Sequence, residues 1–189
     1  MGLFRKLSGS QKHEDVAPTA DTMPDDQFWE IVHKSFKKAK GDYENQLEAL
    51  ASALQKLSPL DILLFNNKFR QLRGLAYRWD IWGAAYIVNG GCGDDSFLDF
   101  RGWIIAQGKD FYNNTLTNPE TLAAINNERI EVDWEGIGYI APTVFEEKTG
   151  VKLPNGFIEN QQILGEEWDE EGDGLQRRFP KLWAKYSSL

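Results

Sequence analysis

The stretch from Leu75 to Gly108 constrains the fold most strongly, because two apolar helical patterns meet there across a glycine-rich turn. Asn89, Gly90, Gly91 and Gly93 supply the backbone freedom that a tight reversal of the chain needs. Two consecutive helices joined by a short loop are usually antiparallel neighbours. The sequence therefore predicts two tightly packed helices at the centre of the fold.

The first of these helices carries charged residues on its apolar face. We interpret the chain from Leu60 to Val88 as one helix, with a bend allowed, and its apolar side chains then form one stripe at about 100° per residue. Arg73 and Asp80 fall near the centre of that stripe. An isolated buried charge costs several kcal/mol, so charges in this position need an explanation.

The second helix begins after the turn and runs to about Gln107. Asp94, Asp95 and Ser96 offer N-cap oxygens and negative charge for its positive end. The adjacent Asp94 and Asp95 are also candidates to hold a hard cation or to act as acid and base. Capping explains them better, because neighbours in a helix point about 100° apart and do not face one ligand.

Antiparallel packing of the two helices would bring Arg101 toward Asp80 or Asp94. Two interpretations follow: a structural ion pair that fixes the register of the helices, or a charged ligand or catalytic pocket. The candidate binding residues in this stretch are Arg73, Asp80, Trp82, Asp94, Asp95 and Arg101.

The composition limits the classes of partner. The chain has 189 residues, of which 41% are hydrophobic and 13% aromatic, enough for one domain with a sizeable core. A net charge of −8 argues against general nucleic-acid binding, which relies on clustered Lys and Arg. No run approaches the roughly 18 apolar residues of a membrane span. We expect a protein partner, with a basic surface.

The sequence contains no motif that indicates an enzyme. Phosphate loops, dinucleotide-binding glycines, nucleophile elbows and zinc-ligand spacings are missing, so we predict no cofactor and no metal site. Cys92 precedes a helix N-terminus, where a thiolate would be stabilised, but a nucleophile also needs a general base. His13 and His33 are the only histidines, and neither is placed for that role. With one cysteine and no secretory segment, we expect a cytoplasmic protein.

The predicted domain organisation is a disordered tail over residues 1–23 followed by a helical domain over residues 24–189. The tail is rich in Ser, Thr, Asp, Ala and Pro and has little to bury. Further helices are expected from Pro24 or Asp25 to about Gly41, from Tyr43 to about Lys56, within Trp134–Thr149, and over Leu175–Tyr186 with an interruption at Pro180. Residues 126–132 are expected to form a loop with a short extended piece. The fold class is all-α, a single compact domain of about seven or eight helices.

A segment that we call the acidic arm, residues 154–174, has no helical pattern. Its carboxylates do not follow the twelve-residue spacing of a calcium loop. We interpret the arm as a solvated face that binds a partner, with Glu166, Glu167 and Glu170 as candidate binding residues.

Three segments of the sequence carry a resemblance to a known family. They are FWEIV at Phe28–Val32, AYRWDIWGAAYIVNGGCGDDSFLDFRGWIIAQG at Ala76–Gly108, and GEEWDEEGDGLQRRFPKLWAKY at Gly165–Tyr186. With these segments the chain resembles the bacterial domain-of-unknown-function family 4240. The resemblance implies a common helical fold and no particular reaction.

Two functions from different classes are compatible with the sequence. The first is a non-catalytic acidic binding module, such as a toxin-neutralising immunity protein or a regulatory partner. The second is an enzyme or small-molecule binder with a charged pocket around Arg101, Asp80 and Asp94. The missing catalytic motifs and the net charge favour the first function.

Overall fold

Several helices begin or end at residues whose chemistry marks a helix terminus. The structure, a computed structural model, describes residues 16–125, 135–169 and 173–187. Asp42 and Ser58 each accept a hydrogen bond from a backbone N–H in the first turn of the helix that follows. Gly150 ends another helix with a left-handed backbone, at a φ of 74°.

The described residues form nine α-helices and two 3-10 helices, and one isolated bridge is their only β pairing. This confirms the all-α class, with more helices than expected because two predicted helices are each divided in two. The elements are α1 (Asp25–Ala39), α2 (Tyr43–Leu54), α3 (Pro59–Leu75), α4 (Trp79–Asn89), α5 (Asp94–Ala106), α6 (Lys109–Thr117), η1 (Pro119–Ala124), η2 (Glu135–Gly138), α7 (Ile140–Thr149), α8 (Gly174–Arg178) and α9 (Pro180–Tyr186).

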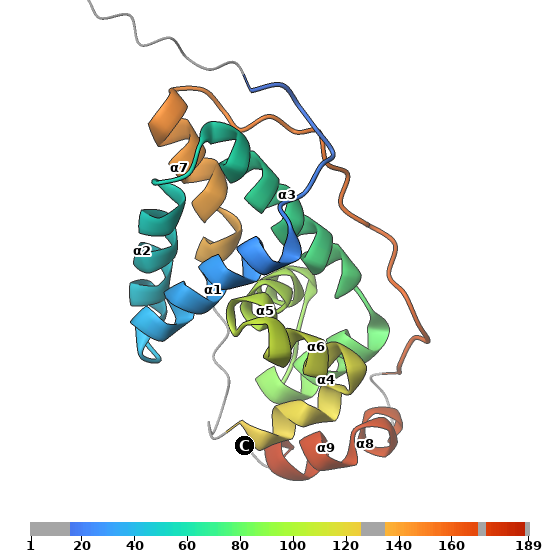
Figure 1. The fold of residues 1–189 in the computed structure, drawn as a ribbon. Coiled ribbons are helices and arrows are strands. Elements are labelled where there is room, and N and C mark those ends of the chain that lie inside the picture. Colours follow the sequence, from blue (N-terminus) through green and yellow to red (C-terminus); the bar gives the residue numbers. More distant parts are fainter. Residues whose placement is uncertain (1–15, 126–134, 170–172, 188–189) are drawn as a thin grey trace, which may run out of the picture.

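The helices form two groups around α5 (Figure 1). One group holds α2, α7 and α3, and α1 crosses in front of α5. The other group holds α4, α6, α8 and α9 at the opposite end of the molecule. Residues 154–169 of the acidic arm run down one side of the molecule, from the first group toward the second.

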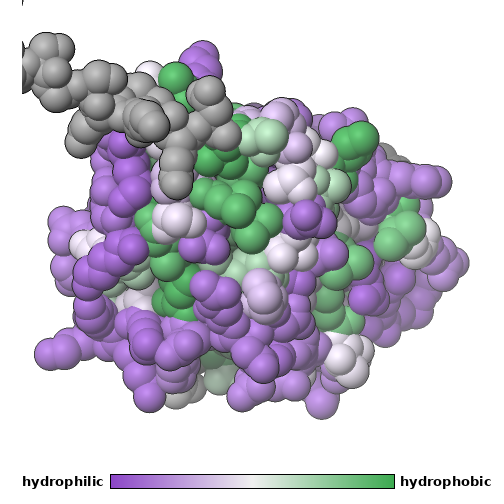
Figure 2. All heavy atoms as spheres, turned by 45° about the horizontal axis from the view of Figure 1, so that its top comes forward, coloured by the Kyte–Doolittle hydropathy of each residue, from purple (hydrophilic) through white to green (hydrophobic). Residues whose placement is uncertain are grey.

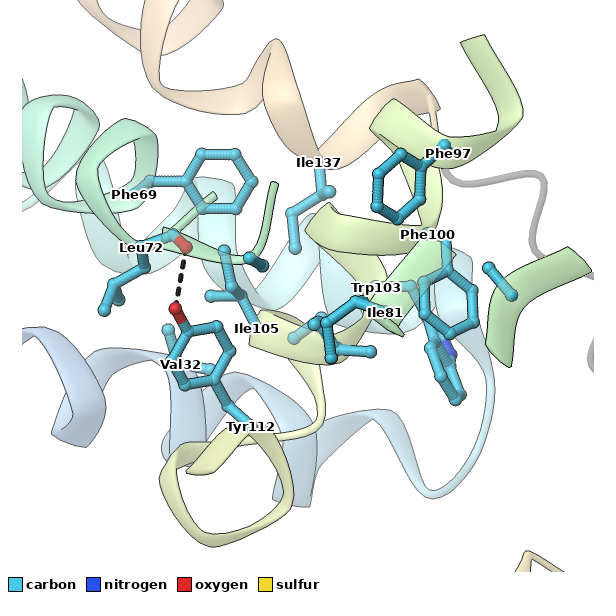
Figure 3. Packing of buried hydrophobic residues seen from close by; sticks show 14 of the residues in the cluster. Val32, Phe69, Leu72, Ile81, Phe97, Phe100, Trp103, Ile105, Tyr112 and Ile137 are labelled. Atoms are coloured by element: carbon cyan, nitrogen blue, oxygen red, sulfur yellow. Dashed lines mark hydrogen bonds between the residues drawn. The ribbon is translucent and has the colours of Figure 1, made fainter. Parts of the chain in front are cut away.

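One part of the core lies where α3, α5 and α6 meet η2 (Figure 3). Phe69, Ile105 and Ile137 lie close together there, and each is buried. The Tyr112 hydroxyl donates a 2.7 Å hydrogen bond to the carbonyl of Leu72, which gives this buried polar group a partner. The core therefore fixes the end of α3 against α5 and α6.

The prediction of one helix from Leu60 to Val88, with a bend allowed, is wrong, because two separate helices cover this range. The chain leaves the helix after Leu75 and starts a new one at Trp79, with Arg78 in an extended conformation at φ −140° and ψ 144°. The break contains neither Gly nor Pro, so no local signal marks it. Because the helical register is lost at the break, Arg73 and Asp80 do not share one helix face.

The acidic arm stabilises this break. The backbone N–H of Trp79 donates to the carbonyl of Leu164 at 2.9 Å, and the N–H of Leu164 donates to the carbonyl of Tyr77 at 3.0 Å. These bonds form a parallel bridge between Arg78 and Leu164. They satisfy backbone groups that an interrupted helix leaves without partners.

Residues 16–23, which we expected to belong to a disordered tail, pack along α3 and the acidic arm. Met23 is buried, and its N–H donates to the carbonyl of Leu64. The Asn67 side-chain amide donates to the carbonyls of Thr19 and Asp21 at 2.9 and 2.8 Å. An internal Asn of α3 thus fixes a segment whose composition indicated a tail.

Two predicted helix boundaries, at Pro180 and at the start of α5, have different outcomes. Pro180 divides the last predicted helix into α8 and α9, as expected. The N-cap of α5 is Gly93, without a side-chain cap, so the predicted capping by Asp94, Asp95 or Ser96 oxygens is wrong. The loop expected at residues 126–132 lies outside the described residues.

Polar side chains dominate the face drawn in Figure 2, where the top of Figure 1 is tilted forward by 45°. Apolar side chains gather near the middle of this face among hydrophilic ones. Among the described helices, none combines the length and the apolar character needed to cross a bilayer.

The packing of residues 16–23 can be tested at Gly156. A Cβ atom at this position would lie 2.4 Å from the backbone nitrogen of Thr19. We therefore expect Gly156→Ala to release the segment, with faster hydrogen exchange at Met23 and a loss of about 1–3 kcal/mol of unfolding free energy. Gly174→Ala is the matched control, since its Cβ would meet only a carbonyl oxygen at 3.7 Å. Equal exchange at Met23 in both variants would contradict the packing.

Candidate functional site

Arg73 binds a carboxylate of the acidic arm that sequence analysis did not select. Its Nε and Nη2 donate to the two carboxylate oxygens of Glu159 at 2.7 and 2.6 Å. The two side chains are only 17% and 12% exposed, so this bidentate pair is largely shielded from water. Arg70 adds a longer contact to Glu159 at 3.4 Å and donates to Asn155 Oδ1 at 2.8 Å.

Arg101 is buried and interacts with the end of α3. Its Nη1 donates to the carbonyl of Arg73 at 3.2 Å, and its guanidinium lies 4.6 Å from the ring centre of Tyr77 and 5.0 Å from that of Phe97. The carbonyls in the last turn of a helix carry partial negative charge, which a cation stabilises. Arg101 therefore caps α3 from the neighbouring α5.

Two further side chains complete this cap. Tyr112 of α6 donates to the carbonyl of Leu72, and the Asn160 side chain of the acidic arm donates to that of Gly74 at 3.4 Å.

Burial, followed by the nearby charge of Arg73, lowers the pKa of Arg101 to about 10. The guanidinium still carries its charge at neutral pH, so the cap is cationic under ordinary conditions.

Asp80 pairs with Arg78, and the expected approach of Asp80 to Arg101 is wrong. Arg78 Nε donates to Asp80 Oδ1 at 2.9 Å, and Arg78 Nη2 binds the second carboxylate oxygen. Asp80 Oδ1 also accepts the N–H of Ile81 in the first turn of α4. The pair belongs to the break between α3 and α4, since Arg78 also donates to the carbonyl of Leu116.

Asp94 and Asp95 are exposed in the first turn of α5. The described hydrogen bonds of Arg101 go to main-chain carbonyls, those of Phe97 and Arg73, so the expected approach to Asp94 is also wrong. Arg101 instead points toward the end of α3. The charged residues of the predicted cluster are thus divided among four places: the Arg73–Glu159 pair, the Arg78–Asp80 pair, the exposed start of α5, and the buried position of Arg101 against the end of α3.

Trp82 lies in a stack of aromatic rings. Its ring stacks on Phe97 at 4.8 Å and on Trp79 at 5.4 Å between centroids. Its Nε1 donates to the carbonyl of Cys92 at 2.8 Å, across the turn between α4 and α5. The half-buried Trp82 therefore stabilises the glycine-rich turn between α4 and α5.

Cys92 is buried, and its thiol is not activated. Burial raises its pKa to about 12, and the negative charge of Asp99 acts in the same direction. The thiolate stabilisation expected from its place before a helix is outweighed by desolvation. Among the described residues, no group of three or more His, Cys, Asp or Glu is arranged to hold a metal ion.

The acidic arm exposes two of its three candidate residues. Glu166 and Glu167 are exposed, and Glu170 lies outside the described residues. Trp168 anchors this part of the arm, because its ring packs 5.0 Å from that of Tyr86 and 6.1 Å from that of Trp79. An added Cβ at Gly83 would lie 3.0 Å from Leu175 and Phe179 and 3.2 Å from the Trp168 ring, so the glycine makes room for all three side chains.

A cleft of about 660 Å³ opens beside the Arg73–Glu159 pair. Its walls come from α3, α5, η2, α7 and the start of the acidic arm. Of the predicted binding residues, Arg73 and Asp95 line it. The others in its lining are Asn66, Phe69, Arg70, Leu98, Asp99, Gly102, Ile137, Gly138, Tyr139, Pro142, Glu146, Lys152, Leu153 and Asn155.

Glu159, Arg78 and Arg70 were not predicted as site residues, for different reasons. Glu159 lies in an irregular segment, where no periodicity relates a side chain to α3. Arg78 was placed inside a helix that the structure interrupts. Arg70 had a usable signal, because it precedes Arg73 by three residues and such residues share one helix face.

A family model described as "Protein of unknown function (DUF4240)" matches residues 23–147, more than half of the chain. The chain belongs to this family. The DUF4240 match includes the segments Phe28–Val32 and Ala76–Gly108 that carry the resemblance, and it ends before the acidic arm. Comparisons with curated proteins and with solved structures found no match.

The reactivity of Cys92 tests the description of this site. With a pKa of about 12, the folded protein holds almost no thiolate at pH 8.5, whereas an unfolded cysteine with a pKa of about 8.5 is half ionised. We expect iodoacetamide at pH 8.5 to alkylate the urea-unfolded chain at least tenfold faster than the folded chain. Equal rates, measured by mass spectrometry, would contradict the burial of this thiol.

Proposed function

We propose that the protein is a non-catalytic binding module and that the acidic arm forms its binding surface. The anchoring of Trp168 is the observation that carries this proposal. The packed Trp168 ring fixes the backbone between Glu167 and Asp169. The exposed carboxylates beside it therefore lie on a segment with a defined position. A held surface loses less conformational entropy on binding than a free tail.

Exposed apolar side chains on the same arm support a protein partner. Leu164 is 47% exposed and Ile158 is 90% exposed, and both lie on the same arm. Protein interfaces combine apolar contacts with a polar rim, and acidic residues complement a basic surface. A net charge of −8 also favours a basic protein partner, because it attracts basic proteins over longer distances.

The state of the polar groups favours binding over catalysis. The Cys92 thiol is held in its protonated form, and the Arg73 and Arg78 guanidiniums are engaged by carboxylates of the same chain. We propose further that the protein is bacterial and cytoplasmic. Its partner is then a basic protein, either the toxin that an immunity protein neutralises or a protein that it regulates.

Charge reversal on the acidic arm tests this proposal. Tagged wild-type protein and the variant Glu166→Lys/Glu167→Lys would capture proteins from a lysate of the native host at 50 and 300 mM salt. We expect a basic protein that the wild type retains at low salt, loses at high salt, and that the variant fails to retain, because the attraction is electrostatic.

The matched control is Glu44→Lys/Glu48→Lys, which makes the same change of net charge at two exposed positions of α2. It should retain the partner at low salt as the wild type does. Equal retention by the acidic-arm variant, or equal loss by the control, would reject the arm as the binding surface.

A further inference from the structure

The cleft beside α3 is a second candidate binding site. Neither of the arm residues proposed to bind a protein partner, Glu166 and Glu167, lines it. Its volume of about 660 Å³ falls within the range of about 300–1,000 Å³ that is usual for small-molecule sites. Phe69, Leu98 and Ile137 come from three different elements and give the cleft apolar lining. The space therefore suits a ligand with an apolar body.

The α3 wall of the cleft is positively charged. Arg70 and Arg73 line it, and Arg101 lies behind them with its Nη1 on the carbonyl of Arg73. Glu159 supplies one carboxylate to Arg70 and Arg73 together. The hydrogen bonds of Glu159 and Asn155 also fix the direction of the two guanidiniums, so little side-chain entropy is lost when they bind an anionic group.

Carboxylates line the α5 and α7 walls. Asp95 and Asp99 lie one turn apart on α5, and Glu146 lies on α7. The cleft lining thus holds three basic residues, Arg70, Arg73 and Lys152, and these three acidic ones. A ligand with a single charge would be attracted by one wall and repelled by another.

We propose that this cleft binds a short peptide with both termini free and an apolar side chain between them. The peptide carboxylate lies against Arg70 and Arg73, and its ammonium group lies against Asp95 and Glu146. The apolar side chain contacts Phe69, Leu98 and Ile137. A peptide fits better than a free amino acid, because the cleft has the volume of sites that take larger ligands.

Isothermal titration calorimetry with the full chain tests this proposal. The probes are the tripeptide Ala-Leu-Ala, its N-acetyl and C-amide derivatives, and free leucine. We expect the free tripeptide to bind at least tenfold more tightly than either derivative and than leucine. No binding of Ala-Leu-Ala at millimolar concentration, or equal binding of the derivatives, overturns the proposal; tighter binding of leucine overturns the choice of a peptide.

Two variants assign the ends of the peptide to the walls. Arg70→Gln should remove the preference for the free carboxylate over the amide, and Asp95→Asn/Glu146→Gln should remove the preference for the free amine over the acetyl group. The control Glu44→Gln/Glu48→Gln should keep both preferences. Circular dichroism shows that each variant is folded. If folded variants keep both preferences, the peptide does not bind in this cleft.

Discussion

The pair between Arg73 and Glu159 joins the last turn of α3 to the acidic arm, and much of the structure depends on this connection. Residues 154–169 of the arm form no helix, so contacts with other segments hold them in place. Glu159 binds Arg73, Asn160 donates to the carbonyl of Gly74, and Leu164 forms the bridge beyond them. Within ten residues, the arm thus covers both the end of α3 and the start of α4.

This connection explains how the chain tolerates a helix break without Gly or Pro. Three side chains from α5, α6 and the acidic arm bind the final carbonyls of α3, and the arm backbone pairs with the residues of the break. The cationic member, Arg101, is buried because it performs this capping role. The charge of Arg101 on the apolar face of α5 therefore indicates the nearby end of α3, whose carbonyl it binds, and not a carboxylate on a facing helix.

The sequence was sufficient to predict the elements with local signals. The glycines that follow Asn89 marked the turn between α4 and α5, and Pro180 marked the division between α8 and α9. It was not sufficient for features that depend on contacts between distant residues, such as the break at Arg78 and the packing of residues 16–23. The same holds for the candidate site, where Arg73 and Asp95 were selected but Glu159, 86 residues from Arg73, was not.

A double-mutant cycle at Arg73 and Glu159 tests the central claim most directly. The unfolding free energies of Arg73→Gln, Glu159→Gln and the double variant give the coupling energy between the two side chains. For this shielded bidentate pair we predict a coupling of about 2 kcal/mol. The exposed pair Glu30–Lys34 is the control and should couple several times more weakly. A coupling at Arg73 and Glu159 no larger than that of the control would contradict the claim that this pair holds the arm to α3.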